Sequence, residues 1–537
     1  MSLRDAVAGR GALLILVAVL AVATASAQEK SDPKKQDPAE LFFRKTEPPR
    51  LVIEIPAASA DGLRKEPRTY ARASIHENGK TDYVDVGIKL KGAAGSYRDF
   101  DDRPGLTVNV DKFTKGQRFH GLEKFHLNNA VQDPSYLREW LAAEIFLAAG
   151  VPAARVTHCR LILGDRDMGV YVVKEGWDDT LLERYFANAD GNLYDGGFCQ
   201  EIDAELEKDA GKGPDDRSDL KALFAITKEP DAKKRWERLN AALDMKAFLT
   251  FTALELMTGH WDGYSVNRNN YRLFFDATTG KAHFLPHGMD QVFQDPNMSI
   301  LDQPGAAVSA ALMKYPEGRK AFRKRLSELL PLFSPVEKLH RRVDEAAARA
   351  RPLFAQVGED AARDFSARVR ELKDTLSQRV KSLVEQNAQP EPKPLAFAGS
   401  TPVKIVGWRK TVECEDAAVL EGNNAGERAY TIKTGKSGRC IASFRKSVFL
   451  SKGKYKLRAI LSTKDVEPLA DSENPGAGIR IAGQNRDLRL VGNVSRKPVD
   501  FEFTVDEDSR NVELIVELNA AKGQLIVSAD SLRLARL

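Results

Sequence analysis

An aspartate, an asparagine and a second aspartate have the residue types and spacing for chemistry on a hydroxyl group. Asp262 and Asn267 are separated by four residues, and Asp290 follows further along the chain. A carboxylate on a short loop can accept a proton from a hydroxyl group, and carboxylate and amide oxygens suit Mg²⁺. A structural Asp that caps a turn gives the same pattern, so the surrounding chain has to decide between the two interpretations.

The chain between these residues predicts a β-hairpin. Strands 270–275 and 281–285 flank a turn at 277–280, and Asp290 comes soon after the second strand. Protein kinases place their catalytic Asp, a metal-binding Asn and a metal-binding Asp in this order along the chain. His260 and His287 have no spacing that would fix them on one face, so a histidine metal site is not predicted.

Lys89 and Lys91 are candidates for binding the phosphates of a nucleotide. They lie on the same face of the predicted strand 83–91, which runs into the small-residue turn 92–96. The backbone amides of such a turn can hold phosphate oxygens, although an ordinary loop has the same composition. Either lysine is equally well explained as a solvated strand residue.

Glu144 and Trp261 are further candidates near this centre. Glu144 lies in a predicted helix and could orient a basic group, although an exposed helical Glu is equally ordinary. Trp261 could stack on adenine beside Asp262, and a buried core Trp is the alternative.

Several separate motifs between about residues 50 and 385 resemble the CotH kinase family. They include Asp262-Gly263-Tyr264, Asn269-Asn270-Tyr271, and Leu285-Pro286 before Asp290. The other motifs are Lys124–Asn129, Asp133–Glu139, Ala149–Ala153, Gly169–Glu175 and Gly191–Tyr194. Two positions depart from the family pattern: Gly288 stands where an acidic residue is usual, and Arg103 stands where a Lys usually precedes the Pro.

The resemblance implies an atypical protein-kinase fold that binds ATP with Mg²⁺ or Mn²⁺ and phosphorylates serine or threonine on partner proteins. By position, it implies that Asp262 is the catalytic Asp, Asp290 the main metal ligand and Asn267 a further metal ligand. Arg103 would contact phosphate, with a guanidinium in place of an ammonium group. The alternative function is a catalytically inactive kinase-like scaffold, which the loss of an acidic residue at Gly288 favours.

The order of predicted elements indicates an α+β fold in two lobes. Residues 318–385 have helical periodicity and predict a helical buttress that Pro352 divides. After a Pro-containing linker, short strands predict a jelly-roll-like β-sandwich. Strands are predicted at 50–55, 83–91, 106–110, 160–163 and 169–173, helices at 137–146, 179–186, 216–224 and 245–258, and the stretch 119–129 is expected to lead out of the sheet.

These patterns divide the chain into a signal peptide (1–27), a flexible lead (28–48), a CotH kinase-like domain (49–388), a linker (389–403) and a carbohydrate-binding-like sandwich (404–537). Arg4 and Arg10 precede an apolar run that is too short to span a membrane. We therefore expect a cleaved signal, no membrane span after its removal, and a secreted, periplasmic or cell-envelope protein.

Composition and aromatic residues bear on the partners. With 81 basic and 76 acidic residues, the formal net charge of +5 gives no support for a nucleic-acid ligand. The expected partners are a protein substrate and, through the C-terminal module, a polysaccharide. Trp408 and Tyr430 are the candidates for stacking on sugars, with core packing as the alternative.

Four cysteines allow two disulfides that each stay within one predicted domain. These would join Cys159 to Cys199 and Cys414 to Cys440. Free buried thiols are the alternative for the first pair.

Overall fold

The computed structural model describes residues 37–45, 47–302, 304–391, 393–412, 416–424, 426–486 and 488–537. The predicted signal peptide lies outside these residues, as does Cys414. Within the described ranges, no helix has both the length and the apolar character that crossing a membrane requires.

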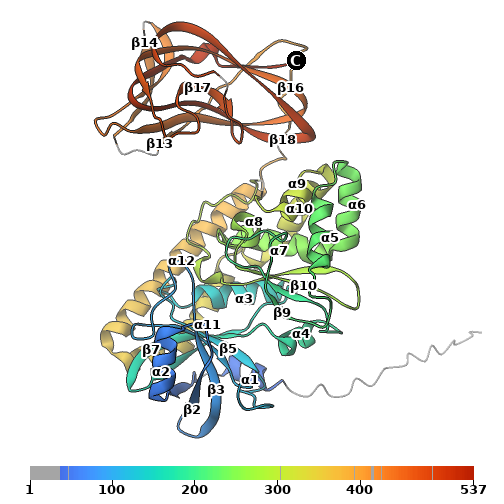
Figure 1. Cartoon of the computed structure of the whole chain (residues 1–537), viewed down its shortest axis with the longest axis vertical. Coiled ribbons are helices and arrows are strands. Elements are labelled where there is room, and N and C mark those ends of the chain that lie inside the picture. Colours follow the sequence, from blue (N-terminus) through green and yellow to red (C-terminus); the bar gives the residue numbers. More distant parts are fainter. Residues whose placement is uncertain are drawn as a thin grey trace, which may run out of the picture.

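A closed β-barrel forms the first lobe (Figure 1), and its strands are hydrogen-bonded in the order β1-β2-β3-β4-β5-β7-β6. Strands with alternating apolar side chains turn one face inward, and Ile53, Ile88 and Leu127 are fully buried there. Helix α2 (Ala57–Lys65) connects β1 to β2. The strands are β1 (Arg50–Glu54), β2 (Ala71–Glu77), β3 (Thr81–Lys91), β4 (Gly105–Asn109), β5 (Lys124–Asn128), β6 (Val156–Leu163) and β7 (Arg166–Glu175).

Two segments belong to this lobe although the sequence predicts otherwise. The stretch 119–129 does not lead out of the sheet, because its residues Lys124–Asn128 form β5 between β4 and β7. The predicted flexible lead is also wrong in part, because Pro38–Arg44 forms helix α1. Phe42 and Phe43 of α1 are buried in the core of the barrel lobe, which gives this charged segment an apolar face.

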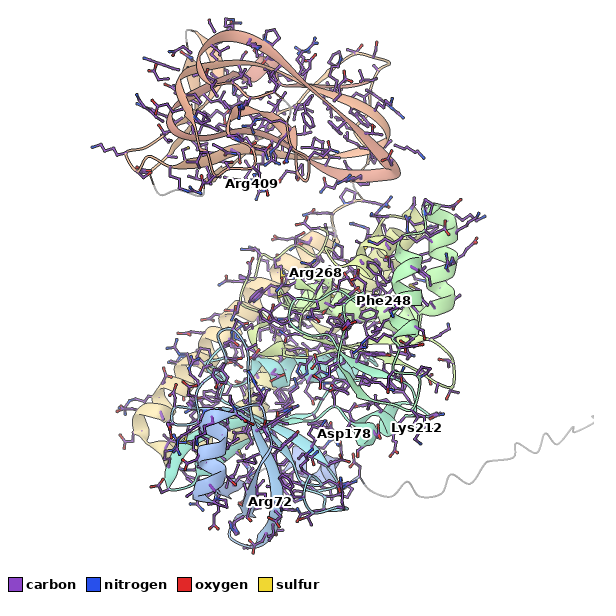
Figure 2. All side chains as sticks on the ribbon, viewed as in Figure 1. Arg72, Asp178, Lys212, Phe248, Arg268 and Arg409 are labelled. Carbon is purple, nitrogen blue, oxygen red and sulfur yellow. The ribbon has the colours of Figure 1, made fainter. Side chains whose placement is uncertain are left out.

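Helices and a small sheet form the second lobe. The sheet has the order β11-β10-β8-β9, and α7 (Met245–Thr258) lies inside the lobe with Phe248 buried (Figure 2). The strands are β8 (Leu193–Asp195), β9 (Lys208–Ala210), β10 (Tyr271–Phe275) and β11 (Ala282–Pro286). The helices are α3 (Arg138–Ala148), α4 (Asp179–Tyr185), α5 (Ser218–Thr227), α6 (Ala232–Ala242), α8 (Tyr264–Asn267), the short η1 (Met289–Gln291) and α9 (Ala307–Met313).

Three long helices form the predicted buttress: α10 (Pro316–Leu329), α11 (Glu337–Val357) and α12 (Glu359–Asn387). The sequence predicts that Pro352 divides this region, but Pro352 lies inside α11. The break between α11 and α12 falls at Gly358, whose φ of 151° is a conformation that glycine adopts far more readily than other residues. The apolar faces of α11 and α12 join the core of the second lobe.

The C-terminal module has a hydrophobic core of its own and follows the linker as a separate body (Figure 1). The α+β fold with a C-terminal β module is therefore confirmed. Trp408 and Tyr430 are 7% and 3% exposed within the module's core, so the prediction that they stack on sugars is wrong and the core alternative holds. The strands are β12 (Val403–Lys404), β13 (Arg409–Val412), β14 (Ala418–Asn424), β15 (Glu427–Lys433), β16 (Cys440–Pro468), β17 (Gly476–Ile481), β18 (Gly492–Ser528) and β19 (Arg533–Arg536).

Cys159 and Cys199 are free thiols, so the first proposed disulfide is absent. Cys159 is buried in the barrel, and Cys199 lies in the second lobe beside Asn267. The second proposed disulfide includes Cys414 and stays a prediction.

Candidate active site

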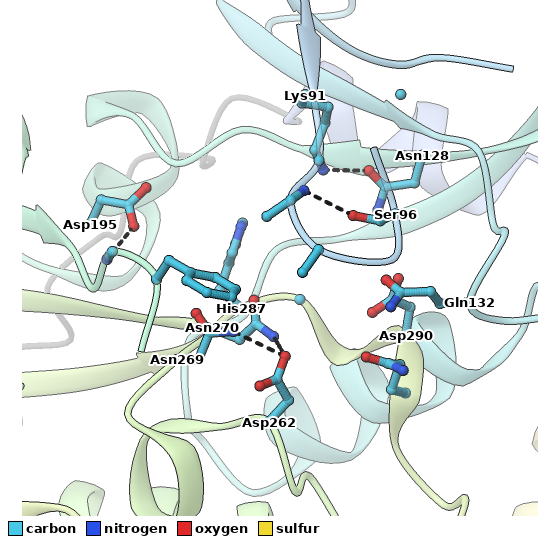
Figure 3. Close-up of a pocket in the computed structure, with 18 of the residues that line it drawn as sticks. Lys91, Ser96, Asn128, Gln132, Asp195, Asp262, Asn269, Asn270, His287 and Asp290 are labelled. Carbon is cyan, nitrogen blue, oxygen red and sulfur yellow. Dashed lines mark hydrogen bonds between the residues drawn. The ribbon is translucent and has the colours of Figure 1, made fainter. Parts of the chain in front are cut away.

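Asp262 and Asp290 line one cavity of about 500 Å³ that is built from both lobes (Figure 3). The hairpin β10–β11 separates the two aspartates in sequence, as predicted, and returns the chain to the same cavity. The first lobe contributes Lys91 and the turn that follows β3, together with Asn128 and Asn129. The second lobe contributes Asp262, Asn269, Asn270, Arg272, His287 and Asp290.

The loop that carries Asp262 is fixed at both of its ends. Helix α7 ends at Gly259, which has a left-handed φ of 68° and turns the chain into the loop. Glu255, fully buried in α7, accepts the backbone N–H groups of Tyr264 and Ser265 at 2.8 and 2.9 Å. These two amides begin α8, so the buried carboxylate holds the chain just after Asp262.

Three amide groups hold the carboxylate of Asp262. The side-chain Nδ2 atoms of Asn267, Asn269 and Asn270 donate to its oxygens at 2.6, 3.0 and 2.8 Å. Neutral amide donors fix the orientation of a carboxylate without placing a cation beside it. The three amides therefore fix the orientation of the Asp262 carboxylate at the edge of the cavity.

His260 links the two aspartate loops. It is fully buried, and its Nε2 lies 3.1 Å from the backbone oxygen of His287, three residues before Asp290. Burial lowers the pKa of His260 to about 4, so the ring is neutral near pH 7 and donates to that oxygen. His260 therefore joins the two aspartate loops through a hydrogen bond between a side chain and the backbone.

Asp290 has the surroundings of a cation ligand. Burial of most of its carboxyl group, together with the charges of Glu139 and Asp133, raises its pKa to about 6, although Lys91 and Lys174 act in the opposite direction. Two further carboxylates close to a third destabilise its charged form. A divalent cation bound at Asp290 would offset this repulsion, because it adds positive charge beside that carboxyl group.

A series of polar contacts near Asp290 joins α3 to three strands of the first lobe. Lys174 of β7 and Glu139 of α3 are 1% and 3% exposed and form an ion pair of 2.5 Å. Asn128 donates to Glu139 at 2.8 Å and accepts from Lys91 at 2.5 Å. Although burial opposes it, the nearby ammonium groups of Lys174 and Lys91 lower the pKa of Glu139. Lys91 and Lys174 thus place two ammonium groups at the cavity, and we call this pair the cationic wall. The buried Lys174–Glu139 ion pair is of the lysine–glutamate type that protein kinases have.

The turn after β3 covers the same cavity. Gly92, Ala93, Ala94 and Ser96 line it, and Ala93 N–H donates to Ser96 Oγ at 3.1 Å. Gly92 has a φ of 111° and an added Cβ would lie 2.9 Å from the backbone nitrogen of Tyr97, so the tight turn needs glycine here. The N–H groups of Ala93 and Ser96 donate to acceptors inside the turn itself. Phosphate binding by the remaining amides of the turn stays a prediction.

Arg103 does not contact the cavity, contrary to the sequence-based prediction. Its guanidinium group donates to the backbone oxygens of Asn129, Met168 and Val170 at 3.0, 2.9 and 2.7 Å. It also lies over the ring of Tyr171, with 4.9 Å to the ring centroid. Arg103 therefore holds β5, β7 and the loop between β3 and β4 together and has no donor directed at a phosphate.

Four other predicted residues also do not line the cavity, and one of them, Asn267, lies beside it through its hydrogen bond to Asp262. Lys89 lines a neighbouring cavity of about 240 Å³, where its ammonium group lies 4.9 Å from the ring centroid of Tyr70. Glu144 is on α3, as predicted, but its charge acts on Arg349 of α11 and the lysine partner is Glu139 instead. Trp261 is 42% exposed and does not line the cavity, so neither adenine stacking nor core packing describes it.

Sequence reasoning missed Lys174, Glu139, Asn269 and Asn270 as members of the site. Lys174 follows the apolar run Val170–Val173 within β7, and a lysine directly after such a run was the available signal. Glu139 and Glu144 lie five positions apart on α3, and only the packing of the helix leaves Glu139 buried and Glu144 partly exposed.

The departure at Gly288 has a structural reason. Its φ is 52°, and a Cβ built there would lie 2.4 Å from Oδ1 of Asn270. Asn270 in turn donates to Asp262, so its side chain occupies the space in which an acidic side chain at 288 would begin.

The residues present fit a divalent cation that shares its ligands with a nucleotide. In the described part of the chain, no group of three or more His, Cys, Asp or Glu could hold a metal by itself. Mg²⁺ commonly uses one or two carboxylates together with phosphate oxygens and water. Asp290 supplies such a carboxylate beside a cationic wall that suits the phosphates.

The CotH kinase protein family matches residues 88–383, which is more than half of the chain. Every residue of the cavity named above lies within this range. The chain belongs to the CotH kinase protein family.

Relatives of this chain in Rhizopus delemar include a spore coat protein homolog and an invasin. Spore coat protein homolog 1 is 25% identical over 226 residues, which cover 38% of this chain and 35% of that protein. Invasin CotH2 is 26% identical over 245 residues, covering 41% of this chain and 39% of that protein. The matches thus span little more than a third of the length of these relatives.

Solved structures give weaker likenesses. The Golgi casein kinase aligns with 65% of this chain and 76% of its own, at 10% identity and a TM-score of 0.26. TmCBM61 in complex with beta-1,4-galactotriose aligns with 24% of this chain and 88% of its own, at 14% identity and a TM-score of 0.18. Similarity of this strength says nothing about activity.

Proposed function

We propose that this protein is an atypical protein kinase that transfers the γ-phosphoryl group of ATP to serine or threonine hydroxyl groups of partner proteins. The observation that carries the proposal is the single cavity in which Asp262, Asp290 and the Lys91–Lys174 wall meet. Family membership supports the same reaction class.

Each part of the cavity has its own task in the proposed reaction. Lys91, Lys174 and the amides of the turn 92–96 bind and orient the phosphates, and Asp290 would hold Mg²⁺ or Mn²⁺. The cation would neutralise charge on the phosphate oxygens. The acceptor hydroxyl oxygen forms a bond to the γ-phosphorus while the bond to the β–γ bridging oxygen breaks and ADP leaves. Asp262 takes the proton of the hydroxyl group.

The surroundings of Asp262 suit this task. Its oxygens accept amide hydrogen bonds but contact no cation among the described residues, so a proton bound there costs no ion pair. Asn267 serves mainly to orient Asp262, and we assign its predicted metal role to Asp290 alone.

The second candidate function is a kinase-like scaffold without catalysis. Gly288, in place of an acidic residue, is the observation that favours it, because a second carboxylate is then missing beside Asp290. The two functions differ in nucleotide binding. A kinase shows a rise in melting temperature with ATP and Mg²⁺ or Mn²⁺ together, and a scaffold without a nucleotide site shows none.

Labelled ATP tests the proposal directly. The mature protein is incubated with γ-labelled ATP, Mg²⁺ or Mn²⁺, and the envelope fraction of its own cells, and phosphoserine and phosphothreonine are then measured. The Asp262→Asn protein is the matched control. Label transfer by the wild type alone supports the kinase, and equal labelling by both proteins contradicts it.

Export to the cell envelope is part of the proposal. The predicted signal peptide supports it, and relatives named for the spore coat and as invasins are in line with it. We propose no sugar-stacking role for the C-terminal module, because the two rings that the sequence offered are buried.

A further inference from the structure

Arg379 is a charged residue on α12 that is 0% exposed. Its guanidinium group donates to four backbone oxygens from two separate segments. In α7 these are Leu256 O at 2.6 Å and Met257 O at 3.0 Å. In the segment after Asp290 they are Pro296 O at 3.1 Å and Met298 O at 2.5 Å.

Carbonyl dipoles hold this cation. The carbonyl groups of Leu256 and Met257 lie in the last turn of α7, where the helix dipole is negative. Leu256 O also accepts the N–H group of Gly259 at 3.1 Å. Burial lowers the pKa of Arg379 to about 10, so the group stays protonated at neutral pH. A planar group with five donors can serve four acceptors at once, which an ammonium group with three donors cannot.

The two segments that Arg379 joins flank the two aspartates of the site along the chain. The last turn of α7 leads directly into the Asp262 loop, and the segment 296–298 follows Asp290. Phe293 N–H also donates to Thr258 O at 2.7 Å, between the same two segments. Further along α12, the side chain of Gln386 accepts from Ile300 N–H at 2.8 Å. Helix α12 therefore makes hydrogen bonds with the chain after Asp290 through two side chains, Arg379 and Gln386.

We propose that Arg379 is a positioning residue that sets the spacing between Asp262 and Asp290, and thereby the rate of phosphoryl transfer. This inference rests on the proposed function for its effect on rate. Its effect on the geometry of the two segments stands apart from any activity.

Two variants of Arg379 test the proposal, with a control on the same helix. Arg379→Lys keeps a cation but reaches fewer carbonyl groups, and Arg379→Met removes the charge. Arg370→Met changes an exposed arginine of α12. For folded Arg379→Lys we expect kcat to fall about 10- to 100-fold with the KM for ATP within about twofold, because a shift of about 1 Å can cost about 10²-fold in rate. Arg370→Met keeps the wild-type kcat.

Amide hydrogen exchange measures the positioning of the two segments without relying on activity. It can be carried out even if Arg379→Met does not fold. In Arg379→Lys and in the milder Gln386→Ala, the amides of Phe293 and Ile300 exchange about tenfold faster or more, while barrel amides keep wild-type rates. Unchanged exchange at these amides, or a folded Arg379→Lys protein with the wild-type kcat, overturns the proposal. If the wild type transfers no phosphate but the exchange result appears, the proposed function fails and the positioning of the two segments stands.

Discussion

Asp262 and Asp290 lie in different surroundings within one cavity. Asp262 accepts hydrogen bonds from three neutral amide groups. Asp290 instead experiences the charges of two carboxylates, Glu139 and Asp133, and of two ammonium groups, Lys91 and Lys174. A carboxylate held by amides keeps its orientation and stays available for a proton. A carboxylate among other charged groups gains most from a bound cation. Neutralising Asp262 and neutralising Asp290 should therefore have different effects on ATP binding and on phosphoryl transfer.

Asp290→Asn should abolish phosphoryl transfer and weaken metal-dependent ATP binding together, because the metal site loses its charge. Asp262→Asn should leave ATP affinity nearly unchanged and lower kcat about 10²- to 10⁴-fold, the usual contribution of a positioned proton acceptor. ATP titrations with Mn²⁺, followed by single-turnover transfer, measure both effects. Asp203→Asn, at an exposed position, is the control. Equal loss of ATP affinity in both site variants would argue against the division of roles.

ATP affinity should fall as the pH rises from 7 to 9. Burial, with the charge of Lys174, lowers the pKa of Lys91 to about 8, so the cationic wall loses charge in this range. A free pKa of about 8 gives up to about tenfold weaker binding at pH 9. The sign for folding is opposite: the unfolded chain, with a lysine pKa of about 10.4, binds more protons between pH 8 and 10, so the stability of the ligand-free protein rises with pH there.

Titrations at several pH values test this dependence. Lys91→Met should bind ATP more weakly at pH 7 and show a flatter pH profile. Lys89→Met changes a lysine of the same strand that lines the neighbouring cavity, and should keep the wild-type profile. A wild-type profile in Lys91→Met would rule out Lys91 as the titrating group.

At the residue scale, the sequence predicts the parts of the site that are local along the chain. Their spacing identified three residues, Asp262, Asn267 and Asp290. Asp262 and Asp290 line the cavity, and Asn267 lies beside it, hydrogen-bonded to Asp262. The pair of Lys174 and Glu139 joins residues 35 positions apart and depends on how β7 packs against α3, which no local pattern encodes. The prediction that Arg103 contacts phosphate was wrong for the same reason, because the backbone oxygens that accept from Arg103 belong to a strand distant in sequence.

At the scale of elements, the hairpin β10–β11 and the turn into η1 present Asp290, and Gly288 is the tightest point of that turn. Gly288→Asp restores the acidic residue that the family pattern has, yet we expect it to lower both stability and kcat. A side chain there meets a left-handed φ of 52° and the amide of Asn270, which would have to leave Asp262. The cost should be about 1–3 kcal/mol in the free energy of unfolding.

Denaturant unfolding and single-turnover kinetics of Gly288→Asp and Gly288→Ala separate the two causes. Both variants carry the backbone strain, but only the Asp adds a charge beside Asp290. Higher kcat in Gly288→Asp would show that the missing acid limits the wild type and that Asn270 can move.

Helices and strands with a clear period were predicted well, and segments with mixed signals were not. Helix α7 has its predicted bounds, Met245–Thr258, because its ends carry strong stop and start residues. Strand β5 is only five residues long and is followed by polar residues, so its pairing with β4 and β7 was not visible. Pro352 failed to end α11 because a helix buried on one face tolerates the loss of one hydrogen bond.

For the whole molecule, part of the predicted linker packs against the C-terminal module. Leu395 and Phe397 pack against the core of the C-terminal module, and Leu395 N–H donates to Phe449 O at 2.7 Å. On the other side, Glu391 forms an ion pair of 3.4 Å with Arg319 of α10. An exposed ion pair contributes little, so the chain around residues 391–394 should be the weakest link between the two bodies.

Two truncations test whether the kinase-like part is complete without the C-terminal module. A protein that ends after Gln389 keeps all of α12, including Arg379 and Gln386, and should retain the melting temperature of the kinase-like part and its ATP binding. A protein that ends after Gln378 lacks the buried guanidinium that holds α7 and the segment after Asp290, and leaves four carbonyl groups without their donor. Because buried unpaired carbonyl groups are costly, this shorter protein should melt well below the first or fail to fold.

Limited proteolysis of the full chain should cut between about Gln386 and Thr401, since the two cores lie on either side of this stretch. Loss of folding in the Gln389 truncation, or cleavage only within the C-terminal module, would mean that the two bodies depend on each other for stability.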